Sequence, residues 1–93
     1  MIKLTPEIEQ KIKQYRVRKI EVFGSFARGE EGPTSDIDLL VEFEERIGYL
    51  KLVRLENELS ELFGRKVDLQ TKKAISPYIL GNILSDVRVI YHA

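Results

Sequence analysis

The sequence contains no cysteine among its 93 residues. A disulfide framework and a cysteine-based zinc site are therefore both excluded. It also has no surplus of either charge, because 15 basic residues balance 15 acidic ones. Proteins that hold long nucleic acids by charge alone need a basic surplus, so this balance argues against that class of function. A small nucleotide is still allowed, since it requires only a local cationic or metal site.

Long apolar runs are missing as well. No stretch reaches the roughly 18 consecutive apolar residues that a membrane-spanning helix needs. The first ten residues lack the apolar segment of a signal peptide. We therefore expect a cytoplasmic protein with no membrane partner. The hydrophobic content of 43% allows a modest core, and the length predicts one domain that spans residues 1–93.

What the sequence does contain is a regular alternation of helical and strand patterns. A capping residue followed by proline marks a helix start at Thr5-Pro6 and again at Ser76-Pro77. Apolar spacing near 3.6 residues predicts helices over residues 6–15, 49–63 and 77–84. A short helix is also expected over residues 25–28, between Gly24 and Gly29. Alternating or β-branched apolar runs predict strands over residues 17–23, 36–43, 66–70 and 86–91. The expected fold class is α/β (α+β), a small mixed four-stranded sheet with helices packed on it.

The segment that links the first two expected strands combines a tight turn with two acids. Gly24 and Ser25 follow an apolar strand end, and ten residues separate Ser25 from Asp36. Because side chains alternate along a strand, Asp36 and Asp38 should point to one face and their apolar neighbours to the other. The Cα atoms of the two acids should lie about 6.6 Å apart, two rises of a strand. The segment is thus a candidate site for a metal ion and a triphosphate.

A third acid, Asp68, lies between two apolar residues of the expected third strand. Three acids on one sheet face repel one another unless a cation neutralises them. Oxygen-only ligands suit Mg²⁺, and two such ions can hold the attacking and leaving oxygens of a displacement at phosphorus.

The residues of the turn suit a phosphate. Gly24 lets the backbone approach closely, and Ser25 supplies a hydroxyl and an N–H group near a helix start. Arg28, about one helical turn further on, can direct its guanidinium to phosphate oxygens. Together with the acids, these residues indicate transfer of a nucleotidyl group, with attack on the α-phosphate and pyrophosphate as the leaving group.

The spacing of Gly24-Ser25 and Asp36-Ile37-Asp38 resembles the signature of the DNA polymerase β-type nucleotidyltransferase superfamily. The compact context GSFARGE, SDIDLLVEF and KVDLQ resembles the minimal nucleotidyltransferases of that superfamily, and this resemblance covers nearly the whole chain. Many minimal nucleotidyltransferases are the antitoxins of toxin–antitoxin pairs whose toxin is a HEPN-domain ribonuclease. The resemblance implies a polymerase β-like fold, in which the first two strands pair antiparallel.

The resemblance also assigns roles to individual residues. It implies that Asp36 and Asp38 ligate Mg²⁺ and that Asp68 completes the catalytic metal site, so the three acids are expected as catalytic residues and metal ligands. Two Mg²⁺ ions and the substrate ATP are the expected cofactors. Gly24 and Ser25 match the phosphate-binding turn, and Arg28 matches a basic residue common in the subgroup.

The function implied is Mg²⁺-dependent transfer of AMP from ATP to a hydroxyl of a partner protein, with a HEPN toxin as the expected partner. No appended domain for tRNA, polynucleotide or antibiotic recognition is found, so the acceptor is expected from a partner or a small molecule. Two alternatives stay open. The chain could be a binding module that neutralises a toxin without catalysis, or it could modify an RNA end or a small molecule.

Each site residue also has a purely structural interpretation. Asp36 could cap a turn, and Asp68 could be an exposed strand residue. Arg28 could form a surface ion pair with Glu30 or Glu31. The order of the Gly-Ser turn, the acid pair and the third acid favours the functional interpretation over these alternatives.

Overall fold

The computed structural model describes residues 2–30, 32 and 35–93, with the side chains in these ranges except those of Ser25, Ala74, Ile79 and Ile83. The helices are α1 (Pro6–Gln14), α2 (Ser25–Arg28), α3 (Tyr49–Phe63) and α4 (Pro77–Leu84), with a 3-10 turn η1 (Lys72–Ala74). The strands are β1 (Val17–Phe23), β2 (Ile37–Phe43), β3 (Val67–Gln70) and β4 (Arg88–His92). The predicted order of helices and strands is confirmed.

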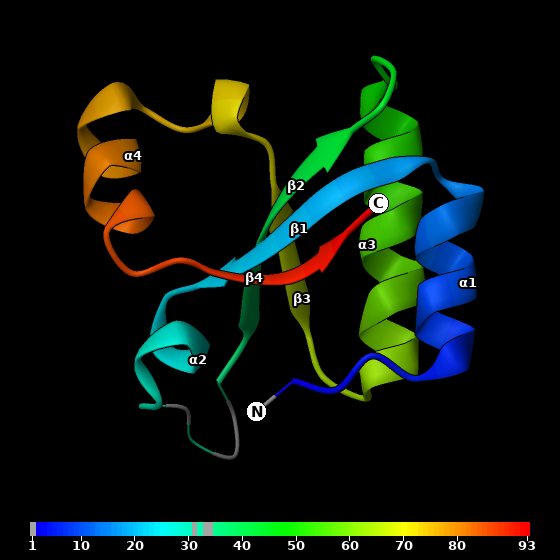
Figure 1. The fold of residues 1–93 in the computed structure, drawn as a ribbon, viewed down its shortest axis with the longest axis horizontal. Coiled ribbons are helices and arrows are strands. Elements are labelled where there is room, and N and C mark those ends of the chain that lie inside the picture. Colours follow the sequence, from blue (N-terminus) through cyan, green and yellow to red (C-terminus); the bar gives the residue numbers. More distant parts are fainter. Residues whose placement is uncertain (1, 31, 33–34) are drawn as a thin grey trace.

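The four strands form one mixed sheet in the order β3-β2-β1-β4 (Figure 1). β1 pairs antiparallel with both β2 and β4, whereas β2 pairs parallel with β3. The expected antiparallel pairing of the first two strands is therefore confirmed. The register places Asp38 opposite Phe23 on one side and opposite Asp68 on the other. Two of the three predicted acids are thus direct neighbours across adjacent strands.

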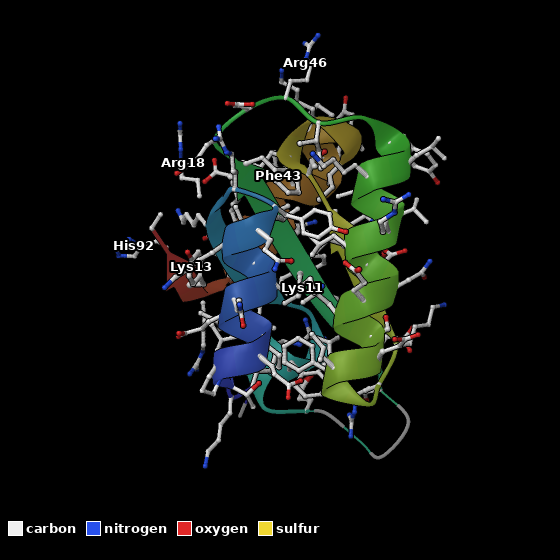
Figure 2. All side chains as sticks on the ribbon, turned by 90° about the vertical axis from the view of Figure 1, so that its right-hand side faces the viewer. Lys11, Lys13, Arg18, Phe43, Arg46 and His92 are labelled. Carbon is white, nitrogen blue, oxygen red and sulfur yellow. The ribbon has the colours of Figure 1, made fainter. Side chains whose placement is uncertain are left out.

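One face of the sheet carries the hydrophobic core. α1 and α3 lie side by side across this face, as two views at right angles show (Figures 1 and 2). Burying their apolar stripes against the strands is what stabilises these helices, since helical propensity alone is weak. Fully buried core residues come from both helices and from the strands: Ile8, Ile12, Ile20, Val22, Ile37, Leu39, Val41, Leu55, Leu59, Val67 and Leu69.

Alternation along the strands sends the polar residues to the other face. Asp38 and Glu42 project there from β2, and Asp68 and Gln70 project there from β3. All four of these side chains are at least partly accessible. The apolar residues of β3 and most of the apolar residues of β2 are buried. The molecule therefore has a sealed apolar face under α1 and α3 and an opposite face rich in carboxylates.

Side chains of α3 fix the outer edge of β3. Ser60 Oγ accepts a hydrogen bond from the Val67 N–H at 2.9 Å, and Glu56 Oε2 accepts one from the Leu69 N–H at 2.8 Å. An edge strand normally presents unpaired N–H groups, which these two side chains satisfy. The residue between the two bonded amides is Asp68. Its backbone position is therefore set by α3 on one side and by β2 on the other.

Helix α4 lies on the side of the sheet opposite α1 and α3 (Figures 1 and 2). Its backbone forms the helix predicted from the Ser76-Pro77 start. Tyr78 and Leu84 are exposed, whereas the predicted apolar side chains of Ile79 and Ile83 lie outside the described part of the chain. In the part of the chain that is described, no helix has the length and apolar character required to cross a membrane.

Candidate active site

The turn after β1 lies directly against the carboxylate of Asp38 in β2. Gly24 has a φ of +73°, a conformation that side chains disfavour. A Cβ atom added at Gly24 would also collide with Oδ2 of Asp38. The turn is closed by a hydrogen bond from the Arg28 N–H to the Gly24 carbonyl at 3.2 Å. Glycine thus avoids both backbone strain and a collision at this position, and the predicted turn and Asp38 are brought together.

The predicted phosphate residue Ser25 is only partly described. Its backbone begins α2 directly after the glycine, as expected from the sequence. Its side chain lies outside the described part of the structure, so the role of its hydroxyl stays a prediction.

The pKa of Asp38 is raised above its ordinary value of 3.8. Partial burial is the main cause, because it disfavours the charged carboxylate. The negative charges of Asp68 and Asp36 raise this pKa further, while Arg28 lowers it. All three charged residues therefore lie near enough to act on Asp38. The structure therefore pairs Asp38 with Asp68 across adjacent strands and places Asp36 and Arg28 where their charges act on Asp38.

Asp36 lies one residue before β2, not within the strand as predicted. Its Oδ2 atom is 3.9 Å from Nζ of Lys66, and its side chain is about half exposed. The next residue, Ile37, donates its N–H to the Lys66 carbonyl at 2.9 Å and so begins the pairing of β2 with β3. Asp36 is thus positioned at the start of the sheet, between Lys66 and Asp38.

Asp68 has a partner that sequence patterns did not reveal. Nε2 of Gln70 donates a hydrogen bond to Oδ1 of Asp68 at 2.9 Å. Both residues project from β3 to the same sheet face, two positions apart. A glutamine two residues after an acid on a strand is the only signal that the sequence offered, and it is a weak one. The bond fixes one oxygen of the carboxylate.

The three acids supply the oxygen ligands that Mg²⁺ prefers, but they do not form a closed metal site. Within residues 2–30, 32 and 35–93, no three acidic or histidine side chains are close enough to enclose a metal ion. Magnesium, however, usually takes only one or two protein carboxylates and completes its shell with phosphates and water. The neighbouring carboxylates of Asp38 and Asp68 supply such an oxygen-only donor pair. Partial burial is the main cause of the raised pKa of Asp38, and the negative charges of Asp68 and Asp36, which raise it further, are ones that a divalent cation would offset.

Arg28 is held at the end of α2 by an acid. Its Nε atom donates a hydrogen bond to Oε2 of Glu30 at 2.9 Å, and both side chains are largely exposed. The surface ion pair considered as an alternative is therefore present, and Glu31 lies outside the described residues. An exposed pair of this kind contributes little to stability. Arg28 could exchange Glu30 for a phosphate at little cost.

A groove of about 1010 Å³ runs from Asp68 to the beginning of α3. Its lining includes the aromatic ring of Tyr49 and the cation of Lys72, which lies 3.6 Å from Glu42. Ligand pockets in proteins commonly fall in the range of roughly 300–1,000 Å³, so the groove has room for a nucleoside or for a segment of an acceptor.

Sequence comparison places this arrangement among known proteins. The model of the family described as nucleotidyltransferase domain matches residues 2–90. Protein adenylyltransferase MntA of Thermococcus cleftensis is 40% identical over 84 residues, which cover 90% of this chain and 85% of that protein. MJ1217 of Methanocaldococcus jannaschii, named as a candidate protein adenylyltransferase, is 51% identical over 75 residues, or 80% of this chain and 76% of its own.

Solved structures share the fold. A chain of a toxin–antitoxin structure with AMP-PNP superposes with a TM-score of 0.79 at 19% identity, covering 94% of this chain and 72% of that chain. A chain from the complex of tri-AMPylated Shewanella oneidensis HEPN toxin with MNT antitoxin gives 0.70 at 17% identity, covering 94% and 68%. A candidate minimal nucleotidyltransferase gives 0.75 at 33% identity, covering 88% and 84%. The two structures below 25% identity show the fold alone.

Proposed function

The chain belongs to the nucleotidyltransferase domain family, and we propose that it transfers AMP from ATP to a hydroxyl of a partner protein. The observation that carries this proposal is the contact between the Gly24 turn and the Asp38 carboxylate, with Asp68 paired beside it. A turn in which glycine avoids strain and a collision, set against two carboxylates, suits a triphosphate with its metal ion. A relative named protein adenylyltransferase that aligns over most of both chains supports the same activity.

Asp38 and Asp68, with Asp36 beside them, are the residues that would hold Mg²⁺. The ion would neutralise the charge that the acids and the triphosphate place together. A second ion and the role of Asp36 as a ligand belong to the same proposal. The Gly24 backbone lies against the phosphates in this arrangement, and Arg28 exchanges Glu30 for a phosphate oxygen.

The reaction is a displacement at the α-phosphorus of ATP. The acceptor hydroxyl oxygen forms the new bond to phosphorus, the bond to the bridging oxygen breaks, and pyrophosphate leaves. Asp68, whose Oδ1 accepts a hydrogen bond from Gln70, would help to draw the proton from the hydroxyl, and the proton leaves to water. Most of the rate enhancement comes from positioning and from charge neutralisation.

The acceptor in this proposal is a HEPN-domain toxin, for which the chain serves as the antitoxin. Support comes from the fold shared with a chain of a complex that contains an AMP-bearing HEPN toxin. A single catalytic domain over residues 1–93 and a location in the ATP-containing cytoplasm are part of the same proposal.

The test is an adenylyl-transfer assay with radiolabelled ATP, Mg²⁺ and the product of the gene adjacent to that of this chain, which the proposal expects to be a HEPN protein. Wild type should label the partner, and mass spectrometry should find AMP on a hydroxyl side chain. Asp38→Asn and Asp68→Asn should lower the rate by more than roughly 10–100-fold, which is the loss typical when a residue that hydrogen-bonds to a metal ligand is replaced. Glu7→Gln is the control, because Glu7 is an exposed acid of α1, which packs on the other face of the sheet.

Two results would contradict the proposal. One is an unlabelled partner with wild type, and the other is equal labelling by the wild type and both asparagine variants. If the asparagine variants still neutralise the toxin in the absence of ATP, the chain is a binding module and not an enzyme.

A further inference from the structure

Arg65, in the short link between α3 and β3, contacts two segments that border the site. Its Nη1 atom donates hydrogen bonds to the carbonyl oxygens of Gly32 at 3.0 Å and Ser35 at 3.2 Å. Its guanidinium also lies over the ring of Phe26, with Cζ 5.1 Å from the ring centroid. One side chain thus binds both ends of the connection that runs from the phosphate turn to the first acid.

The two carbonyls belong to Gly32 and to Ser35, the residue directly before Asp36. The Gly32 N–H donates to Ser35 Oγ at 2.8 Å, and the Ser35 N–H donates to the Gly32 carbonyl at 3.2 Å. These reciprocal bonds link Gly32 to Ser35, and Arg65 binds the carbonyl oxygens of both. A displacement of Ser35 would carry Asp36 with it, because Asp36 is the next residue in the chain.

The aromatic contact belongs to the other end of the connection. Phe26 follows Ser25 in α2 and packs against the hydrophobic core. A guanidinium is planar, so it can donate its fork of N–H groups in its own plane while its flat side covers an aromatic ring. Lysine cannot do both. Arg65 therefore sets the position of α2 relative to Gly32 and Ser35.

Arg65 is itself anchored to the rigid part of the molecule. Gly64 ends α3 with a φ of +67°, and the Arg65 N–H donates to the Ser60 carbonyl at 3.2 Å. The carbonyl of the following residue, Lys66, accepts the Ile37 N–H and so belongs to the ladder between β2 and β3. Hydrogen bonds to α3 and to the sheet thus fix the backbone around Arg65, while its side chain contacts Phe26, Gly32 and Ser35 beside the site.

We propose that Arg65 is a positioning residue that sets the separation between the Gly24-Ser25 turn and Asp36, and thereby the affinity for the metal–nucleotide complex. This inference rests on the proposed nucleotidyl transfer. Removing the guanidinium should weaken binding of the complex about tenfold or more, as loss of a residue supporting metal ligands does. The hydrophobic core should remain intact, because Arg65 lies outside it.

The experiment measures binding of Mg²⁺ with α,β-methylene-ATP by titration calorimetry, alongside adenylyl transfer. Arg65→Met should weaken binding about tenfold or more, and Arg65→Lys should fall between it and wild type. Arg54→Met is the matched control, because Arg54 is an exposed arginine of α3 outside the site. Tyr15→Phe controls for stability, since it removes a 2.6 Å hydrogen bond to Glu58 between α1 and α3.

Wild-type affinity in a folded Arg65→Met protein would overturn the inference, as would an equal loss in Tyr15→Phe. If Arg65→Met does not fold, Phe26→Leu replaces it. That variant removes the aromatic surface but keeps the two hydrogen bonds, and unchanged binding would again overturn the inference. A wild-type protein that binds no Mg²⁺–nucleotide would instead refute the proposed function, so the two failures are distinguishable.

Discussion

At the scale of single residues, Gly24 and Asp38 constrain one another. The carboxylate occupies the space where any other residue would carry its Cβ atom. The sequence identified both residues, because a Gly-Ser turn and an Asp-x-Asp pair are local patterns. It missed Gln70, because a glutamine two residues after an acid on a strand is a weak signal, and it missed Arg65, because its hydrogen bonds reach residues that local periodicity does not place. The bond from Arg65 to Gly32 spans 33 positions.

Replacing Gly24 with alanine should combine backbone strain with a collision. Gly24→Ala places an L-residue at positive φ, which costs about 1–2 kcal/mol of folding stability. It also pushes Asp38 aside, and a displacement of about 1 Å can cost roughly 100-fold in rate. Steady-state adenylyl transfer and urea unfolding measure the two effects.

Gly29→Ala is the control for that variant. Gly29 has a φ of +71°, but nothing lies within 4 Å of the position that a Cβ atom would take there. The variant should lose similar stability and keep its activity. Equal activity of the two alanine variants would show that the contact with Asp38 has no catalytic importance.

At the scale of secondary structure, the predicted helices and strands agree with the structure because their signals are local. Capping residues, proline and apolar spacing placed α1, α3 and α4 closely. The pairing partners could not be read in this way. The pairing of Asp38 with Asp68 depends on β3 lying parallel to β2, which follows from how α3 packs. β4 begins two residues later than expected, since residues 86 and 87 belong to the connection after α4.

The hydrogen bond from the Val67 N–H to Ser60 at the edge of β3 predicts a loss of stability when Ser60 is replaced. Ser60→Ala should leave the N–H of the buried Val67 without its partner, at a cost of about 1–3 kcal/mol. Ser85→Ala is the control, because that hydroxyl bonds only the exposed Asn82 carbonyl among the described contacts. Urea unfolding midpoints measure both. A Ser60→Ala protein as stable as Ser85→Ala would show that α3 does not support this edge.

The hydrogen bond between Tyr15, at the end of α1, and Glu58 of α3 should make the free energy of unfolding depend on pH at high pH. Tyr15 donates a hydrogen bond to Glu58, and burial together with that acid raises the pKa of Tyr15 from 10.0 to about 12. The folded protein therefore keeps a proton that the unfolded chain loses. The resulting stability is fully present below pH 10 and is lost as the pH rises toward about 12. Unfolding free energies between these pH values should fall less steeply for Tyr15→Phe, and identical slopes would contradict the assignment.

At the scale of the whole molecule, the fold separates stability from chemistry. Two helices seal one face of the sheet, while the opposite face presents Asp38 and Asp68, and a groove extends from Asp68 past the end of the sheet to the beginning of α3. The formal net charge of zero hides this uneven distribution. Composition could argue against a charge-driven polynucleotide binder, but it could not locate the acids. Asp38 and Asp68 lie close together because β2 and β3 are neighbours in the sheet, and composition does not reveal that order.

The measurement that tests the central claim most directly is a crystal structure of the chain with Mg²⁺ and α,β-methylene-ATP. The account predicts the triphosphate against the Gly24 turn and a metal ion about 2.1 Å from carboxylate oxygens of Asp38 and Asp68. A nucleotide bound elsewhere, or a triphosphate at the turn with neither carboxylate on a metal ion, would contradict it.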